Sequence, residues 1–176
     1  MNHMIEKLET ENLVLRKALD EDLEYIWQRV WKDDALSKMM LWQPTLTYEE
    51  ALSRLERTKA YQAQNDAFFV CLRDTDEPIG FAGIREHGPD EYEESGICIA
   101  QGYQNRGYGK EVLSALIDLA FNTLKGSRFL YSCFHENCSS EALCKSCGFV
   151  YLSSEYKVRE WDGYRYLCDT YELKRG

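Results

Sequence analysis

A glycine-rich segment constrains this chain more than any other part of it. The segment has the sequence QNRGYGK over residues 104–110 and joins an apolar run that ends at Ala100 to a helical pattern that begins near Glu111. A turn that opens a helix presents unpaired backbone N–H groups at the positive end of the helix dipole, and glycine lets the backbone approach a ligand closely. Such turns bind anions, and Arg106 and Lys110 can add charge-assisted contacts. The segment therefore predicts a strand, a phosphate- or pyrophosphate-binding loop and a helix in succession.

The spacing of this loop separates it from two common phosphate-binding motifs. A P-loop requires Gly-x-x-x-x-Gly-Lys-Ser/Thr and a dinucleotide fingerprint requires Gly-x-Gly-x-x-Gly, and neither occurs in residues 104–110. The segment instead matches Gln/Arg-x-x-Gly-x-Gly/Ala, the acyl-CoA pyrophosphate loop of the GNAT superfamily of N-acetyltransferases, which the chain resembles here. A plain turn at the start of a helix is the alternative interpretation of so short a pattern, so the flanking elements must decide.

Composition limits the class of protein and its partners. With 176 residues, of which 44% are hydrophobic and 13% aromatic, the chain can form one globular domain over residues 1–176. The net charge of -9 gives no general basic surface for a nucleic-acid backbone. An acidic protein favours cationic partners such as polyamines, protein N-termini and lysine side chains, although the same charge can serve solubility alone.

The sequence carries no signal for a membrane or for export. No apolar run approaches the about 20 residues of a membrane-spanning helix, and Met1–Lys7 lacks the hydrophobic centre of a signal peptide. The seven cysteines are odd in number and lie in a chain that is not small, so they are expected to be reduced thiols. We therefore expect a cytoplasmic protein without a membrane partner.

Hydrophobic periodicity and turn signals predict an α/β (α+β) chain with a mixed central sheet of about seven strands and about four flanking helices. Thr47 and Glu50 have the spacing of a capping box, and Asp162-Gly163 is typical of a hairpin turn. The expected strands are Leu8–Lys17, Ala67–Arg73, Ile79–Arg85, Tyr92–Ala100, Phe129–Phe134, Val150–Val158 and Tyr164–Leu173. The expected helices are Glu21–Trp31, Tyr48–Gln64, Gly109–Leu124 and Ser139–Cys147.

This order of elements resembles the GNAT fold along nearly the whole chain. Two parts of the chain are most similar to the branch that contains ribosomal-protein N-terminal acetyltransferases (RimJ/RimL-like). They are the segment Thr47–Ala51 and the pattern Asn137-x-x-Ser140 followed by Lys145-x-x-Gly148-Phe149. That branch also includes many small-molecule acetyltransferases and often dimerises, so the resemblance implies an amine acceptor of open identity and allows a homodimer. The three local motifs that carry the resemblance are Glu94–Ala100, Gln104–Lys110, and Asn137-x-x-Ser140 followed by Lys145-x-x-Gly148-Phe149.

The resemblance implies acetyl-CoA as the co-substrate and assigns most of its contacts. The pantetheine arm is expected along the backbone of Cys98, Ile99 and Ala100, where the N–H of Ile99 would polarise the thioester carbonyl. Preorganised donors of this kind can stabilise a tetrahedral oxyanion by about 3 kcal/mol. Asn137 and Ser140 are expected to contact the arm or the sulfur from the opposite side. The pyrophosphate is expected on Gln104, Asn105, Arg106, Gly107, Tyr108, Gly109 and Lys110.

Acetyl transfer to an amine also requires a base, since an alkyl ammonium has no lone pair with which to attack. Glu94 lies where several GNAT members place a general-base glutamate, at the head of the strand before the loop. Strand alternation would put Glu94, Gly96 and Cys98 on one face, so that the carboxylate could reach the thioester directly or through water. The alternative is that Glu94 is a solvated surface charge, with Glu93 or water as the base.

The proton donor to the departing thiolate stays unassigned by the sequence. Many family members have a tyrosine at the position of Cys144, and a thiol is a poorer donor. Ser140, Cys144 or water could deliver the proton.

The predicted function is therefore acetyl transfer from acetyl-CoA to a primary amine, directly within a ternary complex. The first alternative is a GNAT-like module that binds acyl-CoA as a sensor or interaction module. A remote alternative is a zinc site with Cys133, His135, Cys138, Cys144 and Cys147 as ligands. Two of these cysteines fall inside a predicted amphipathic helix, where thiols usually belong to the core, so no metal is expected.

Other candidate residues have ordinary structural interpretations. Trp31, Trp42 and Tyr48 are expected to belong to the core, with a substrate groove as the alternative. His87 and His135 lie on predicted loops and are expected to be ordinary surface residues rather than catalytic bases.

Overall fold

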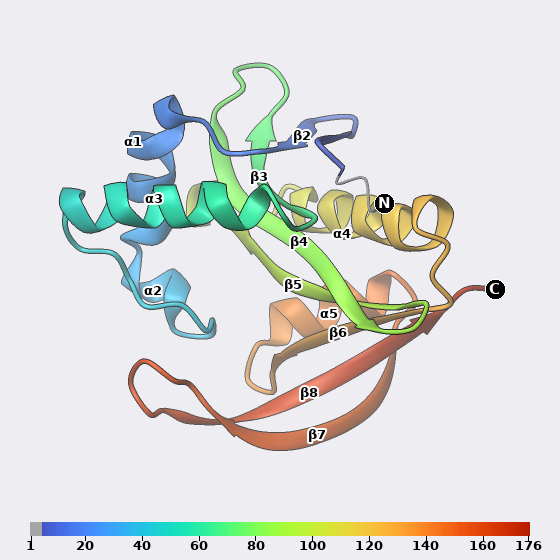
Figure 1. Ribbon diagram of the computed structural model, residues 1–176. Helices are drawn as coiled ribbons and strands as arrows, with labels where there is room; N and C mark the ends of the chain where they lie inside the picture. Colours follow the sequence, from blue (N-terminus) through green and yellow to red (C-terminus); the bar gives the residue numbers. More distant parts are fainter. Residues whose placement is uncertain (1–4) are drawn as a thin grey trace.

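The computed structural model describes residues 5–176 and contains a mixed sheet of eight strands (Figure 1). The strands are β1 (Lys7–Glu9), β2 (Leu13–Arg16), β3 (Ala67–Leu72), β4 (Pro78–Gly88), β5 (Glu91–Ile99), β6 (Arg128–Phe134), β7 (Val150–Val158) and β8 (Arg165–Lys174). Their order is β1-β2-β3-β4-β5-β6-β8-β7, in which β5 and β6 are parallel and the other neighbours are antiparallel. The predicted mixed sheet is confirmed.

Helices cover both faces of this sheet. They are α1 (Leu23–Ile26), α2 (Asp34–Ser37), α3 (Tyr48–Gln62), α4 (Tyr108–Asp118) and α5 (Cys138–Ser146). Helix α1 follows a 3-10 turn at Asp20–Asp22, and α1 and α4 continue into π-helical turns at Trp27–Trp31 and Leu119–Thr123. Within residues 5–176, no helix is both long enough and apolar enough to cross a membrane.

Two clusters of buried side chains hold the helices to the sheet. On one face, Leu113 and Leu116 of α4 pack against Ile84 of β4, together with residues of α5. On the other face, Ala51 and Leu55 of α3 pack with residues of α1. Apolar residues three or four positions apart lie on the same side of a helix, and their burial determines which side turns toward the sheet.

The first predicted strand is wrong in one respect. The sequence predicts a single strand over Leu8–Lys17, but the chain turns and forms the antiparallel pair β1 and β2, which raises the strand count from seven to eight. Thr10 donates from its N–H to the carbonyl of Leu13 at 2.9 Å, and a carboxylate oxygen of Glu111 accepts the N–H of Asn12 at 2.7 Å. Because Glu111 lies on the distant helix α4, the local pattern cannot reveal this partner of the turn.

A fifth helix, α2, lies in a segment that the sequence predicts as a loop. Asp33 caps it by accepting the N–H of Leu36 at 3.1 Å. One turn is too short for hydrophobic periodicity to mark. The predicted cap of α3 is confirmed, since Oγ1 of Thr47 accepts the N–H of Glu50 at 3.2 Å.

A bulge in β5 decides which face each of its side chains takes. Ile84 of β4 pairs with Glu94, whereas the residue before Ile84 pairs with Gly96, so Ser95 is an extra residue. Gly96 has a φ of 138°, which favours glycine. The predicted common face of Glu94, Gly96 and Cys98 is therefore wrong. Glu94 lies opposite Ile84 on the α4 face, whereas Cys98 packs on the α1–α3 face.

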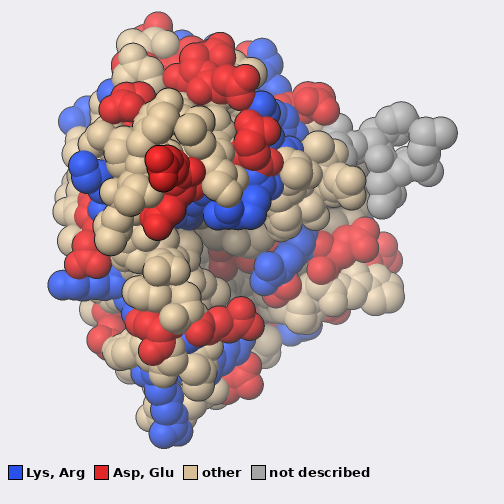
Figure 2. Space-filling model, turned by 60° about the vertical axis from the view of Figure 1, so that its left-hand side comes forward, with Lys and Arg blue, Asp and Glu red and all other residues tan. Residues whose placement is uncertain are grey.

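Strands β5 and β6 part after a short parallel contact. Glu91–Glu93 pair with Arg128–Leu130, and beyond these residues the two strands have no paired positions in the described chain. The facing backbone edges are therefore open where β5 leads into α4. Figure 2, which brings the left-hand side of Figure 1 forward, shows a recess near the middle of the visible surface of the molecule, with interspersed acidic and basic side chains around it.

Gly80 of β4 allows the close approach of β4 to β5. A Cβ atom at Gly80 would lie 1.9 Å from the carbonyl oxygen of Cys98. We expect Gly80→Ala to lower the free energy of unfolding by roughly 3 kcal/mol, because the backbone of one strand must move. Urea denaturation measures this change. Gly102→Ala is the control, since a Cβ there meets no atom within 4 Å and should change stability by less than about 0.5 kcal/mol. Equal effects of the two substitutions would contradict the prediction.

Candidate functional site

The N-terminus of α4 presents free backbone donors. Gly107 is the N-cap, with a φ of 84° that favours glycine, and Asn105 also has a positive φ, of 64°. The N–H groups of Tyr108, Gly109 and Lys110 have no hydrogen-bond partner within residues 5–176. These donors lie at the positive end of the dipole of an 11-residue helix, which suits an anion such as pyrophosphate.

Side chains beside this turn fix its shape. Nε2 of Gln104 donates to the carbonyl of Ile99 at 2.9 Å. Nη2 of Arg106 donates to the carbonyl of Gly102 at 3.0 Å, and the Arg106 guanidinium carbon lies 5.2 Å from the ring centroid of Tyr103. The fold therefore gathers the whole predicted loop at one helix end, where Gln104 and Arg106 also brace the turn.

The open edge of β5 carries the amide that the sequence analysis assigns to the thioester. The N–H of Ala100 donates to the carbonyl of Ile79 at 2.7 Å, so sheet pairing uses this group. Backbone groups of adjacent strand residues point to opposite edges, which directs those of Ile99 toward the gap between β5 and β6. The carbonyl of Ile99 accepts Gln104 on that side. Of Cys98, Ile99 and Ala100, it is Ile99 whose backbone faces the gap.

The carboxyl group of Glu94 lies where β5 and β6 part. Its Oε1 accepts the backbone N–H of Ser132 in β6 at 3.2 Å. Burial raises the pKa of Glu94 to about 7, and backbone hydrogen bonds and the charge of Arg85 offset only part of this effect. A carboxyl group with such a pKa exchanges a proton near neutral pH, which suits a general base.

Glu93, the alternative base, is engaged elsewhere. Strand alternation turns it to the face opposite Glu94, where Nε of Arg85 lies 2.8 Å from its Oε1 and Nδ1 of His87 lies 3.5 Å from its Oε2. The ion pair with Arg85 occupies the Glu93 carboxylate. The geometry therefore favours Glu94 as the acceptor of a proton at the gap.

Tyr131 of β6 is a candidate site residue that the sequence analysis does not identify. Its hydroxyl lies 2.5 Å from Oγ of Ser140, whose N–H donates to Oδ1 of Asn137 at 3.1 Å. Burial, and then the charge of Glu94, raise the pKa of Tyr131 above its ordinary value. In the sequence Tyr131 alternates with Phe129 and is typical of a core position. The fold brings it beside the predicted Asn137 and Ser140.

Cys144, the third predicted catalytic residue, belongs to the core. It is fully buried, and its Sγ donates to the carbonyl of Glu141 at 3.4 Å. Burial raises the pKa of this thiol to about 12, and because the side chain has no exposed surface it cannot contact a bound thioester. Within the part of the chain that the structure describes, no three His, Cys, Asp or Glu side chains are placed to hold a metal ion. The zinc alternative therefore has no ligand group there.

His135 is exposed, as the sequence suggests, but it is not isolated. Its Nδ1 lies 2.8 Å from Oδ2 of the buried Asp169. Oγ of Ser154 donates to the other oxygen of Asp169 at 2.5 Å, and the hydroxyl of Tyr151 lies 2.6 Å from the same Oγ. Pairing of β6, β8 and β7 creates this chain of contacts, so local sequence could not reveal it. It orders the segment that leads into Asn137.

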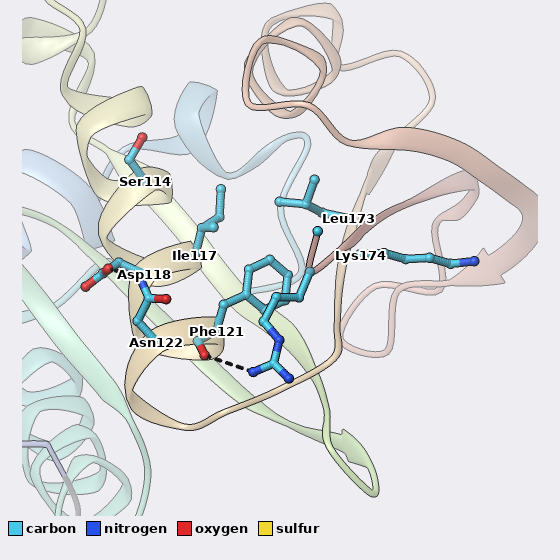
Figure 3. Close-up of a pocket in the computed structure, with 9 residues that line it drawn as sticks. Ser114, Ile117, Asp118, Phe121, Asn122, Leu173 and Lys174 are labelled. Carbon is cyan, nitrogen blue, oxygen red and sulfur yellow. Dashed lines mark hydrogen bonds between the residues drawn. The ribbon is translucent and has the colours of Figure 1, made fainter.

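Two surface grooves lie along α4. One, of about 350 Å³, is lined by Ile117, Phe121 and Leu173 (Figure 3). Nη1 of Arg175 donates to the carbonyl of Phe121 at its edge, at 3.4 Å. The other, of about 450 Å³, lies between α4 and β1. Neither groove includes Glu94 or the predicted loop, so they are separate from the candidate site.

Known proteins share both the sequence pattern and the fold. Residues 12–150 match the family described as Acetyltransferase (GNAT) domain. The uncharacterized N-acetyltransferase p20 of Bacillus licheniformis is 28% identical over 151 residues, which cover 82% of this chain and 83% of that protein. A candidate ribosomal-protein-serine acetyltransferase of Vibrio cholerae is 26% identical, with a TM-score of 0.80 and coverage of 96% of this chain and 97% of that chain. The microcin C7 self-immunity acetyltransferase MccE, solved with acetyl-CoA and AMP, has a TM-score of 0.80 at 17% identity and covers 94% of this chain and 93% of that chain, a similarity of fold.

Burial of Glu94 makes stability depend on pH. The pKa of Glu94 is about 7 in the folded chain, compared with the ordinary value of 4.5 that applies to the unfolded chain. Folding therefore disfavours the ionised carboxylate. The stability that comes with the protonated carboxyl is fully present below about pH 4.5 and is lost as the pH rises through about 7. We therefore expect Glu94→Gln to stabilise the chain against unfolding at pH 8 by roughly 2 kcal/mol more than at pH 5.

Urea denaturation of the parent and the variant at both pH values measures this difference. Glu155→Gln is the control, because the side chain of Glu155 is 70% exposed and should show little change with pH. A Glu94→Gln effect of the same size at pH 5 and pH 8 would show that the pKa is not raised.

Proposed function

The chain belongs to the GNAT acetyltransferase family, and on this premise we propose that it moves the acetyl group of acetyl-CoA directly to a primary amine in a ternary complex. Acetyl transfer from acetyl-CoA is the activity of the family. The observation that carries the finer proposal is the free N-terminus of α4 directly after the open edge of β5. These two features offer backbone donors for a pyrophosphate at one end and for a thioester at the other.

Acetyl-CoA would contact backbone groups from the start of α4 to the open edge of β5. The amides at the start of α4 and the charge of Arg106 would take the pyrophosphate. The pantetheine arm would continue along β5, with Asn137 on the β6 side. The N–H of Ile99 would donate to the thioester oxygen and would strengthen that bond as the oxyanion forms. The direction of the Ile99 backbone toward the gap supports this assignment.

The reaction requires one proton to leave the amine and one to reach the thiolate. Glu94 would accept the amine proton, directly or through water, and its pKa of about 7 supports this role. As the nitrogen–carbon bond forms and the carbon–sulfur bond breaks, the electron pair stays on sulfur. Ser140 would protonate that sulfur while its Oγ takes a proton from the hydroxyl of Tyr131, 2.5 Å away. The proton that Glu94 accepted would then return to Tyr131, directly or through water, which restores both groups. The fully buried Cys144 receives no role.

We assign the chain to the branch of ribosomal-protein N-terminal acetyltransferases, whose members also act on small amines. The Vibrio cholerae structure, at 26% identity, supports this branch. The acceptor is therefore a protein N-terminus or a small amine. A sensor that binds acetyl-CoA without transfer is the alternative, and release of CoA in an amine screen would exclude it. A cytoplasmic location and a homodimer stay predictions.

The first test concerns the pyrophosphate loop. Gly109→Glu places a carboxylate beside the free N–H groups of α4, and a Cβ at this position makes only ordinary contact, 3.5 Å from Leu143. The variant should fold, and its affinity for acetyl-CoA should fall roughly 100-fold, because the added charge repels the pyrophosphate and occupies its donors. Calorimetric titration with acetyl-CoA measures the change. Gly109→Ala is the control and should bind within a few-fold of the parent chain. If Gly109→Glu bound acetyl-CoA with unchanged affinity, the pyrophosphate would not bind at this loop.

The second test concerns the base. Glu94→Gln should leave acetyl-CoA affinity nearly intact and lower kcat at neutral pH roughly 100-fold. In the parent chain, kcat should rise with pH through about 7, because the Glu94 carboxylate must be ionised to accept a proton. The variant should lose this step and recover partly at high pH, where more amine is free. Steady-state CoA release from pH 5 to 9 measures both profiles. An unaltered profile would assign the base to another group or to water.

A further inference from the structure

Arg54 lies between two tryptophan rings on the α1–α3 face. Its guanidinium carbon is 4.5 Å from the ring centroid of Trp31 and 5.0 Å from that of Trp42. Nη1 donates to Oγ1 of Thr45 at 3.0 Å and to the carbonyl of Gln43 at 3.4 Å. These contacts use one nitrogen. Nε and Nη2 have no hydrogen-bond partner among the described residues, and the residue as a whole is mostly buried but keeps part of its surface exposed.

The charge of Arg54 is not neutralised by the protein. Two other largely buried arginines each pair with a carboxylate at 2.8 Å, Arg16 with Asp22 and Arg159 with Asp162. Arg54 forms no such ion pair within residues 5–176. Burial, and then the charge of Arg57, lower the pKa of Arg54 to about 10. A buried charge without a partner is costly, so this position calls for an anion.

Asp33 is a carboxylate of the same region that is already engaged. The charges of Asp33 and Arg54 both act on the pKa of the Cys98 thiol. The two oxygens of Asp33 accept Nε2 of Gln101 at 3.0 and 2.8 Å, and one of them also caps α2. Asp33 therefore supports the loop after β5 and leaves Arg54 unpaired.

Trp42 supplies a second unused donor at the same place. Its Nε1 is shielded from solvent and is the one buried side-chain polar atom without a hydrogen-bond partner in the part of the chain described. The ring also packs edge-to-face on Phe81, with centroids 6.4 Å apart. Buried N–H groups almost always have a partner, so an unpaired one beside an unpaired guanidinium is an independent sign of a missing acceptor atom.

We propose that Arg54 and Trp42 bind the carboxylate of the acceptor, so that the acceptor is an amine that also carries a carboxylate, as an amino acid does. The inference rests on the proposed acetyl transfer. Arg54 belongs to the face of the sheet on which Cys98 packs, and Cys98 adjoins Ile99, the residue assigned to the thioester. A carboxylate held there leaves the amine of the same small molecule within reach of the gap.

The chemistry favours a carboxylate over a phosphate. A guanidinium offers two parallel donors that match the two oxygens of a carboxylate, and Trp42 adds a single neutral donor. The surroundings are aromatic, with Trp31, Trp42 and Phe81, and the single positive charge of Arg54 balances one negative charge. A phosphate dianion would remain half neutralised in this apolar setting, which is unfavourable.

The experiment measures CoA release at saturating acetyl-CoA for the standard amino acids, the carboxamide of each, polyamines and phosphoethanolamine. We expect kcat/KM for the preferred amino acid to exceed that for its carboxamide about tenfold or more. Arg54→Gln should lower kcat/KM for the amino acid about 10- to 100-fold, mainly through KM, and leave the carboxamide within about threefold. Trp42→Phe keeps the aromatic packing, removes the N–H and should cost roughly 3- to 10-fold for the amino acid alone.

Arg57→Gln is the matched control. It removes the same charge from an exposed position one turn along α3 and should not alter the preference. Acetyl-CoA titration of each variant shows that it is folded. Equal use of amino acid and carboxamide, preference for phosphoethanolamine, or a preference that survives both Arg54→Gln and Trp42→Phe would overturn this inference while acetyl transfer stands. Failure to acetylate any amino acid would also overturn it. If the parent chain itself did not bind acetyl-CoA, that result would instead overturn the proposed function.

Discussion

The candidate site depends on a stretch of strand backbone that is paired with a neighbouring strand on one edge only. Strand β5 pairs with β4 along its length but with β6 over only three residues, so its far edge is unpaired. Unsatisfied buried N–H and C=O groups cost about 1–3 kcal/mol each, so a sheet tolerates an open edge only where water or a ligand reaches it. Because Gly80 has no Cβ, β4 can lie close to the carbonyl of Cys98, and the β4–β5 ladder holds β5 in place while β6 departs. The fold therefore keeps a linear array of backbone donors available for an extended ligand.

The same separation of strands positions the two groups to which we assign the proton transfers. Glu94 and Tyr131 come from the two strands that diverge, and both lie just beyond the last paired residues. Packing at the base of the gap buries both groups and raises both pKa values. The bulge at Ser95 turns Glu94 toward this gap, whereas an unbroken strand would keep it in phase with Cys98. A local backbone irregularity thus selects which of two adjacent glutamates, Glu93 or Glu94, meets β6.

The sequence predicts features that depend on neighbouring residues. The QNRGYGK loop, the cap of α3 and most strands follow from glycine spacing, a capping residue and periodicity. Features that depend on contacts between distant residues are missing from the prediction. The turn between β1 and β2 needs Glu111, and Asp169 reaches His135 only through sheet pairing. Tyr131 has the pattern of an ordinary core residue, and its neighbour Ser140 is visible only in three dimensions.

Net charge and local charge act on different parts of an acceptor. The net charge of -9 attracts cations, yet the candidate acceptor side carries an arginine without a carboxylate partner. These facts are compatible because they operate at different ranges. The field of the whole chain acts over about 8 Å in physiological salt and draws an ammonium toward the protein, whereas Arg54 acts through contact hydrogen bonds. An amine that also bears a carboxylate satisfies both, and it meets the gap with its ends in opposite environments. A polyamine would be attracted by the net negative charge of the chain, but its ammonium groups would be repelled by the positive charge of Arg54.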